Sequence, residues 1–125
     1  MLVADDNESF LAWAAKFLAA QPGLTLVGSA RDGHEAVDMA AALHPDLVLM
    51  DVAMPTLNGL QAARAIRDAG GAPRIVMMTL HDSPDYQRAA EAVADGFVVK
   101  RDLGRELGPL LTRLFTTPPP EEPRP

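Results

Sequence analysis

The 125-residue sequence contains no cysteine, which excludes disulfide bonds and thiolate metal sites. No apolar run approaches the roughly 20 residues that a membrane-spanning helix needs. The opening stretch, MLVADDNESF, lacks the basic segment and long apolar stretch of a secretory signal. Basic residues are also scarce, because 11 Lys and Arg face 17 Asp and Glu, for a net charge of −6. Since nucleic-acid binding needs a basic patch, these absences together predict a cytoplasmic protein that contacts neither membrane nor nucleic acid directly.

The remaining composition is that of an ordinary globular domain, with 48% hydrophobic and 22% charged residues. Five apolar runs are expected to form strands, at 1–4, 24–30, 46–50, 74–79 and 96–100. The runs alternate with five segments of helical spacing, at 8–20, 31–43, 56–69, 83–94 and 103–115. The strands show no polar alternation, which predicts a parallel sheet covered by helices on both faces, the doubly wound α/β class.

Three local features qualify this pattern. Pro109 falls inside the last expected helix, so that helix is expected either to start near Gly108 or to have irregular first turns. Trp13 is expected to be buried or half-buried. Residues 116–125, TTPPPEEPRP, are too rich in proline to pack as helix or sheet. The sequence therefore predicts one domain over 1–115 followed by a linker or tail.

Polar residues stand at the carboxyl ends of four expected strands. Asp5 and Asp6 follow the first strand, Asp51 the third, Thr79 the fourth and Lys100 the fifth. In open parallel sheets the ligand site lies beyond these strand ends. We therefore expect the five side chains to share one crevice.

Such a crevice would hold the groups that phosphoryl transfer supported by magnesium needs, although each residue taken alone could also be an ordinary cap, turn or strand-end residue. Three clustered carboxylates repel one another unless a cation is present, and Mg²⁺ prefers oxygen ligands. Asp51, alone on the middle strand, is the candidate nucleophile for an acyl phosphate. Asp6 and Asp51, with a backbone carbonyl, are expected to hold the metal, with Asp5 assisting. Lys100 and Thr79 are expected to contact the phosphoryl oxygens.

Four stretches of the sequence resemble the receiver domain of bacterial two-component response regulators. They are VADD at 3–6, LVLMDVAMPTLNG at 47–59, MMT at 77–79 and ADGFVVK at 94–100. The resemblance covers residues 1–115. The sequence of the last stretch is most similar to that of the subfamily that carries a C-terminal helix-turn-helix domain.

The resemblance implies a flavodoxin-like fold with five parallel strands in the order 2-1-3-4-5 and five helices. It implies that Asp51 accepts a phosphoryl group from a sensor histidine kinase in a reaction that requires Mg²⁺. By the same match, Asp5 and Asp6 are the acidic pair and the carbonyl of Ala53 is a further metal ligand. Lys100 then contacts the phosphate.

Thr79 and Phe97 are, by the same resemblance, the two switch residues. Their movement is expected to change the face formed by the fourth helix, fifth strand and fifth helix. That face controls an output, transcription in the resembled subfamily, and is the expected surface of a homodimer. The chain is then a phosphoacceptor signalling domain, limited to its own phosphorylation and dephosphorylation, and not an enzyme.

Two rival functions remain open on the sequence. One is a magnesium-dependent phosphatase with an aspartate nucleophile. Such enzymes usually carry a second aspartate two residues after the first, and here that position is Ala53. The other rival is a degenerate receiver that acts as an interaction module without phosphorylation.

Overall fold

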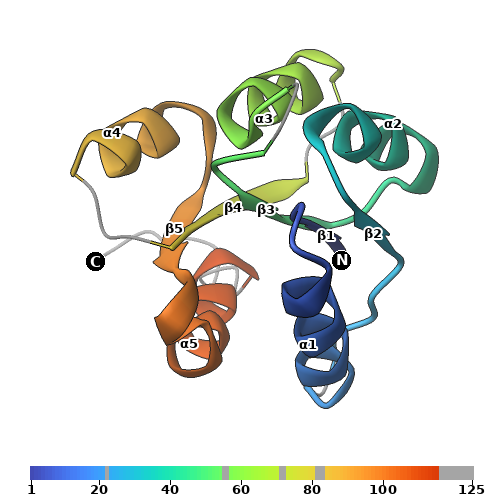
Figure 1. Ribbon diagram of the computed structural model, residues 1–125, viewed down its shortest axis with the longest axis vertical. Helices are drawn as coiled ribbons and strands as arrows, with labels where there is room; N and C mark the ends of the chain where they lie inside the picture. Colours follow the sequence, from blue (N-terminus) through green and yellow to red (C-terminus); the bar gives the residue numbers. More distant parts are fainter. Residues whose placement is uncertain (22, 55–56, 71–72, 81–83, 116–125) are drawn as a thin grey trace, which may run out of the picture.

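The computed structural model describes most of the chain (Figure 1), namely residues 1–21, 23–54, 57–70, 73–80 and 84–115. The predicted proline-rich tail at 116–125 lies outside the described residues. None of the described helices combines the length and the apolar character that crossing a membrane requires.

Strands and helices alternate strictly along the chain, as the sequence predicts. The strands are β1 (Leu2–Ala4), β2 (Gly28–Ala30), β3 (Leu47–Asp51), β4 (Arg74–Thr79) and β5 (Gly96–Val99). The helices are α1 (Glu8–Ala19), α2 (Gly33–Leu43), α3 (Gly59–Asp68), α4 (Pro84–Val93) and α5 (Leu103–Phe115). A short 3₁₀ turn over Lys100–Asp102 connects β5 to α5.

The five strands form one parallel sheet in the order β2-β1-β3-β4-β5. This confirms the predicted flavodoxin-like fold. The order places β1 and β4 on either side of β3, and β5 beyond β4. The carboxyl ends of β1, β3, β4 and β5 therefore line one continuous edge of the sheet.

Helices cover both faces of the sheet, with α1 and α5 on one side and α2, α3 and α4 on the other (Figure 1). Successive strand residues alternate between the two layers, because side chains along a strand point to opposite faces. In β3, for example, Val48 and Met50 belong to the α2–α4 core, and Leu47 and Leu49 to the α1–α5 core. Both faces are therefore dry, which explains the absence of polar alternation in the sequence.

Three local predictions need correction. Of the expected strand at 24–30, only Gly28–Ala30 pairs, because the β1 register begins at Leu2 opposite Gly28. Trp13 is not in the core, since 45% of its surface is exposed.

The last helix does not start near Gly108. It runs unbroken from Leu103 and contains the exposed Pro109, while three leucines bury its other side: Leu103, Leu107 and Leu110. That apolar face outweighs the main-chain hydrogen bond that proline cannot donate.

Gly59 allows α3 to begin directly against the end of β3. Asn58 caps the helix, accepting from the Gln61 backbone N–H at 2.9 Å. The Gly59 N–H donates to the Val52 carbonyl at 2.8 Å. A Cβ atom on Gly59 would lie 1.9 Å from the carbonyl oxygen of Asp51. Only glycine therefore fits here, and its close approach fixes the backbone that carries Asp51.

We expect Gly59→Ala to lower the free energy of unfolding by about 1–3 kcal/mol or more, because backbone atoms have to move apart. Gly104→Ala is the matched control, since a Cβ there meets only Phe17 Cε1 at 3.9 Å. The control should be neutral or stabilising by up to about 1 kcal/mol, because alanine favours helices over glycine. Urea unfolding measures both values. Equal stabilities for the two variants would contradict the proposed close contact.

Candidate functional site

The structure brings Asp5, Asp6 and Asp51 together at the carboxyl edge of the sheet. One carboxylate oxygen from each residue lies within 4.8 Å of the others. Asp5 follows β1 and is fully buried, and Asp51 ends β3 and is 6% exposed. Asp6 is exposed. The cluster is thus built into the sheet edge on two sides and opens to solvent at Asp6.

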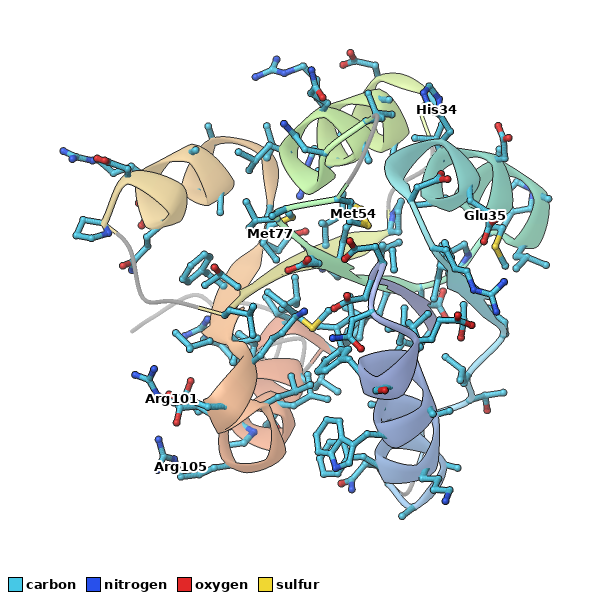
Figure 2. All side chains as sticks on the ribbon, in the orientation of Figure 1. His34, Glu35, Met54, Met77, Arg101 and Arg105 are labelled. Carbon is cyan, nitrogen blue, oxygen red and sulfur yellow. The ribbon has the colours of Figure 1, made fainter. Side chains whose placement is uncertain are left out.

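Lys100 reaches into this cluster from the end of β5. Its Nζ atom forms an ion pair with Asp5 Oδ2 and lies 3.6 Å from Asp51 Oδ1. Only 9% of the lysine side chain is exposed. The next two arginines on the chain, Arg101 and Arg105, point away toward solvent (Figure 2). Both pair with Asp102, Arg101 at 3.9 Å and Arg105 at 2.9 Å. Lys100 is therefore the cation that serves the acidic cluster among the described residues.

Asp5 is held on both sides of its carboxylate. Oδ1 accepts a hydrogen bond from the Asn7 backbone N–H at 2.9 Å. Oδ2 is buried and forms an ion pair with the Lys100 ammonium. It accepts no hydrogen bond of regular geometry from the described residues. The Asp5 backbone N–H donates to the Ala30 carbonyl at 2.9 Å. These contacts fix Asp5 where it offers one oxygen to the cluster.

The Asp51 carboxyl is harder to ionise than an ordinary aspartate. Its pKa is raised from 3.8 to about 6, and burial is the main cause. The charges of Asp5 and Asp6 also raise the pKa, while the Lys100 ammonium lowers it. At neutral pH Asp51 is therefore mostly ionised, but its charge lacks full compensation.

The charge balance and the donor atoms of the cluster fit a divalent cation. Three carboxylates face a single ammonium, which leaves an excess of negative charge. The metal-ligand atoms that the described residues offer here are carboxylate oxygens, the ligands that Mg²⁺ prefers. The Asp6 side is open to solvent, so a metal there can keep several waters. Ala53, two residues past β3, is exposed near the same edge.

The two predicted switch residues lie on neighbouring strands. Thr79 ends β4 and is buried, and Phe97 is half-buried in β5 against the α2–α4 core. The register pairs Met77 with Phe97 and Thr79 with Val99. Alternate residues of a strand share a face of the sheet, so Thr79 lies on the same face as Met77. Because Met77 is the partner of Phe97, the Thr79 and Phe97 side chains also share that face.

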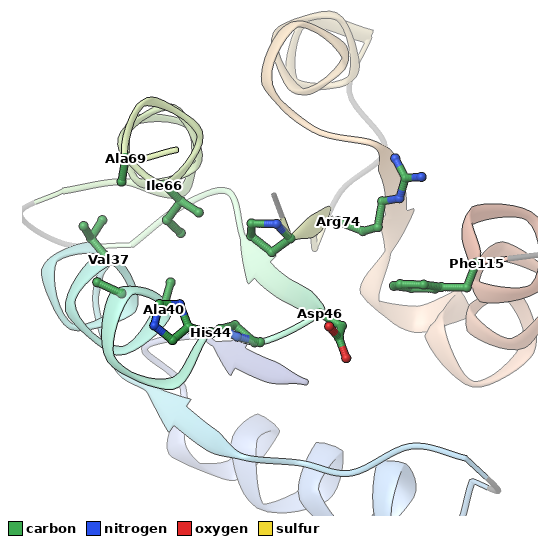
Figure 3. Close-up of a pocket in the computed structure, with 11 residues that line it drawn as sticks. Val37, Ala40, His44, Asp46, Ile66, Ala69, Arg74 and Phe115 are labelled. Carbon is green, nitrogen blue, oxygen red and sulfur yellow. The ribbon is translucent and has the colours of Figure 1, made fainter. Parts of the chain in front are cut away.

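Two larger hollows lie at the opposite, amino-terminal edge of the sheet. One, of about 600 Å³, is lined by residues that include Val37, His44, Ile66, Arg74 and Phe115 (Figure 3). The other, of about 700 Å³, adjoins it. Neither is lined by any residue of the acidic cluster. The acidic edge is therefore separate from these two hollows.

The sequence did not predict two contacts of the site. Asn7 links Asp5 to the start of α1, because its own Oδ1 accepts from the Phe10 backbone N–H at 3.0 Å. The Phe10 ring lies beneath Lys100, with Nζ 4.5 Å from the ring centroid. An asparagine just before a helical segment is a recognisable capping signal. Nothing in the sequence pattern marks the contact between Phe10 and Lys100, since it joins residues far apart in the chain.

The Asp51 pKa predicts that Asp51→Asn is more stable than wild type near neutral pH without metal. Between pH 3.8 and about 6 the folded wild type keeps a proton that the unfolded chain releases, so wild-type stability falls as pH rises through this window. The variant avoids this loss, with a gain of up to about 3 kcal/mol near pH 7 that vanishes toward about pH 4.

Urea unfolding in EDTA across this pH range measures the gain. Asp68→Asn, at the exposed end of α3, makes the same chemical change outside the cluster and should alter stability by less than about 0.5 kcal/mol. A gain for Asp51→Asn that does not depend on pH would contradict the burial argument.

Comparison with known proteins identifies the family. The model of the response regulator receiver domain matches residues 1–108. The chain is 38% identical over 109 residues to a protein-glutamate methylesterase/protein-glutamine glutaminase of Geobacter metallireducens, covering 87% of this chain and 31% of that protein. It is 33% identical over 108 residues to the transcriptional regulatory protein LiaR of Bacillus subtilis, covering 86% and 51%. The chain thus spans about a third of the length of the first relative and about half of the second.

Solved structures agree with the sequence relatives. The signal receiver domain of the putative response regulator NarL from Mycobacterium tuberculosis superposes with a TM-score of 0.84 at 28% identity, covering 94% of this chain and 95% of that one. The response regulator domain of Thermotoga maritima CheB gives 0.79 at 30% identity, covering 94% and 96%. The chain therefore belongs to the response regulator receiver domain family.

Proposed function

We propose that this receiver accepts a phosphoryl group on Asp51 from a sensor histidine kinase in a magnesium-dependent reaction. The observation that carries the proposal is the position of Asp51 Oδ1, 3.6 Å from the Lys100 ammonium within a cluster of three carboxylates. This arrangement combines a nucleophile, a cation for the incoming charge and a donor set for a metal. The receiver family supports the same conclusion.

The transfer is a displacement at phosphorus. An Asp51 carboxylate oxygen forms a bond to the phosphorus atom, and the bond from phosphorus to the donor's histidine nitrogen breaks, with its electron pair staying on the imidazole. The Asp51 pKa of about 6 leaves the carboxylate ionised for attack near neutral pH. Lys100 is positioned to pair with phosphoryl oxygens, and Thr79 donates its hydroxyl to one of them.

Asp6, Asp51 and the Ala53 carbonyl would hold the metal, with Asp5 assisting. When bound, Mg²⁺ supplies charge stabilisation to the phosphoryl oxygens during transfer. Asp5, buried and paired with Lys100, keeps the ammonium in place beside Asp51. The protein residues thus set the position of the nucleophile and of its counter-charge.

The phosphoryl group would then act as a switch by adding charge and acceptor oxygens at the end of β3. Thr79 moves toward it, and Phe97, on the same face of the sheet, occupies the space released. The face formed by α4, β5 and α5 changes as a result, and this face controls the output or a homodimer.

Two candidate outputs follow from the relatives. Transcription is favoured by the match to LiaR, and control of a methylesterase by the match to the Geobacter protein. We retain transcription as the proposed output, with residues 1–115 as the receiver and 116–125 as a linker or tail. A phosphatase with its own turnover is the weaker alternative, because Ala53 stands where such enzymes carry a second aspartate.

Phosphorylation is tested by mass spectrometry after incubation with acetyl phosphate and MgCl₂. Wild type should gain the mass of one phosphoryl group, and Asp51→Asn should gain none, because only the carboxylate attacks phosphorus. Asp68→Asn is the matched control and should label like wild type. Equal labelling of wild type and Asp51→Asn would refute the nucleophile assignment, and no labelling of wild type would favour the degenerate receiver.

Metal binding is tested by thermal unfolding with and without MgCl₂. Mg²⁺ should raise the Tm of wild type, because a ligand that binds only the folded state stabilises it. At a concentration 100 times the Kd, the stabilisation is about 2.7 kcal/mol. Asp6→Asn should lose most of this gain while leaving the buried Asp5–Lys100 pair intact. A full gain in Asp6→Asn would show that the metal binds elsewhere.

A further inference from the structure

The Lys100 ammonium has a third neighbour besides the two aspartates, the face of the Phe10 ring. Nζ lies 4.5 Å from the ring centroid, within the roughly 6 Å range of cation–π attraction. The lysine side chain is only 9% exposed, and such attraction is strongest when water is excluded. The ring is thus placed to act on the position of the ammonium.

Phe10 and Asp5 are linked by a closed circuit of contacts. Asp5 Oδ1 accepts from the Asn7 backbone N–H, and Asn7 Oδ1 accepts from the Phe10 backbone N–H. The Phe10 ring contacts the Lys100 ammonium, which pairs with Asp5 Oδ2. The turn that orients Asp5 therefore also orients the ring on the other side of the ammonium.

The Phe10 ring also belongs to a row of three neighbouring aromatic rings on α1. Trp13 lies 5.7 Å from Phe10 between ring centroids, and it stacks on Phe17 at 5.1 Å with an interplanar angle of 5°. Phe10 and Phe17 both pack against the α1–α5 core. Of these three rings, the one that lies under the Lys100 ammonium is that of Phe10.

We propose that Phe10 is a positioning residue for phosphorylation, whose ring holds the Lys100 ammonium between Asp5 and Asp51. Without the ring, the four-carbon stem of the lysine leaves more positions open to Nζ, and the charge needed by the incoming phosphoryl oxygens is less well placed. This inference rests on the proposed phosphorylation of Asp51 for its consequence in rate, but the contact between the ring and Lys100 can be measured separately.

The test uses three variants on α1. Phe10→Leu keeps an apolar side chain against the core but removes the ring, and Phe10→Tyr restores a ring. Phe17→Leu is the matched control, because Phe17 lies on the same helix and packs against the same core, while the ring under the Lys100 ammonium is that of Phe10. Thermal unfolding confirms that each variant is folded before the measurements.

The first readout is the NMR shift of the lysine side-chain methylene protons. The chain has two lysines, so Lys16 on α1 provides an internal reference. In wild type, Phe10→Tyr and Phe17→Leu, the Lys100 signals should be displaced upfield of the Lys16 signals by the ring current. In Phe10→Leu this displacement should disappear. A displacement that persists in Phe10→Leu would overturn the inference.

The second readout is the rate of labelling by acetyl phosphate at saturating MgCl₂. Phe10→Leu should label about 2- to 30-fold more slowly than wild type, the range that corresponds to typical cation–π free energies. Phe10→Tyr and Phe17→Leu should keep nearly the wild-type rate. Labelling of Phe10→Leu at the wild-type rate, or of Phe10→Tyr as slowly as Phe10→Leu, would overturn the inference. If wild type takes no label, the proposed function fails, and wild-type Lys100 signals without the upfield displacement would separately overturn the contact between Phe10 and Lys100.

Discussion

The ion pair between Lys100 and the fully buried Asp5, beside Asp51, is the interaction on which the site depends. Removing one partner of a buried pair leaves an uncompensated charge and strongly destabilises a protein. Here one ammonium faces three carboxylates, so compensation is incomplete even with the pair intact. Burial is the main cause that raises the Asp51 pKa to about 6, and the Lys100 ammonium opposes this rise. The excess of carboxylates over ammonium groups suits the edge to a metal cation.

The parallel sheet produces this concentration of charge. Because β1, β3, β4 and β5 end on one edge, residues from distant parts of the chain meet there without a dedicated pocket. The two dry faces of the sheet hold those ends rigidly, and Gly59 brings α3 against the backbone of Asp51. Stability and chemistry are thus connected: the packing that buries the strands also forces partly unpaired charges together. A phosphoryl group or a metal changes the charge at that edge, so either can act on the fold.

Much of this arrangement could be predicted from the sequence because it depends on strand ends. Apolar runs that stop at Asp5, Asp51, Thr79 and Lys100 indicate both the sheet and the edge at which these polar residues lie. The limits of β2 could not be predicted, because they depend on the register with β1 and not on local preference. The ring of Phe10 beneath Lys100 was missed for a similar reason, since that contact is created by tertiary packing.

The central claim is that the carboxyl edge gathers three carboxylates into one cation site. Anomalous diffraction from crystals soaked in Mn²⁺, which takes the same oxygen ligands as Mg²⁺, tests it most directly. The account predicts one strong peak within coordination distance of Asp6 and Asp51, with Lys100 still paired to Asp5. A peak elsewhere on the molecule, or none at this edge with the aspartates apart, would contradict it.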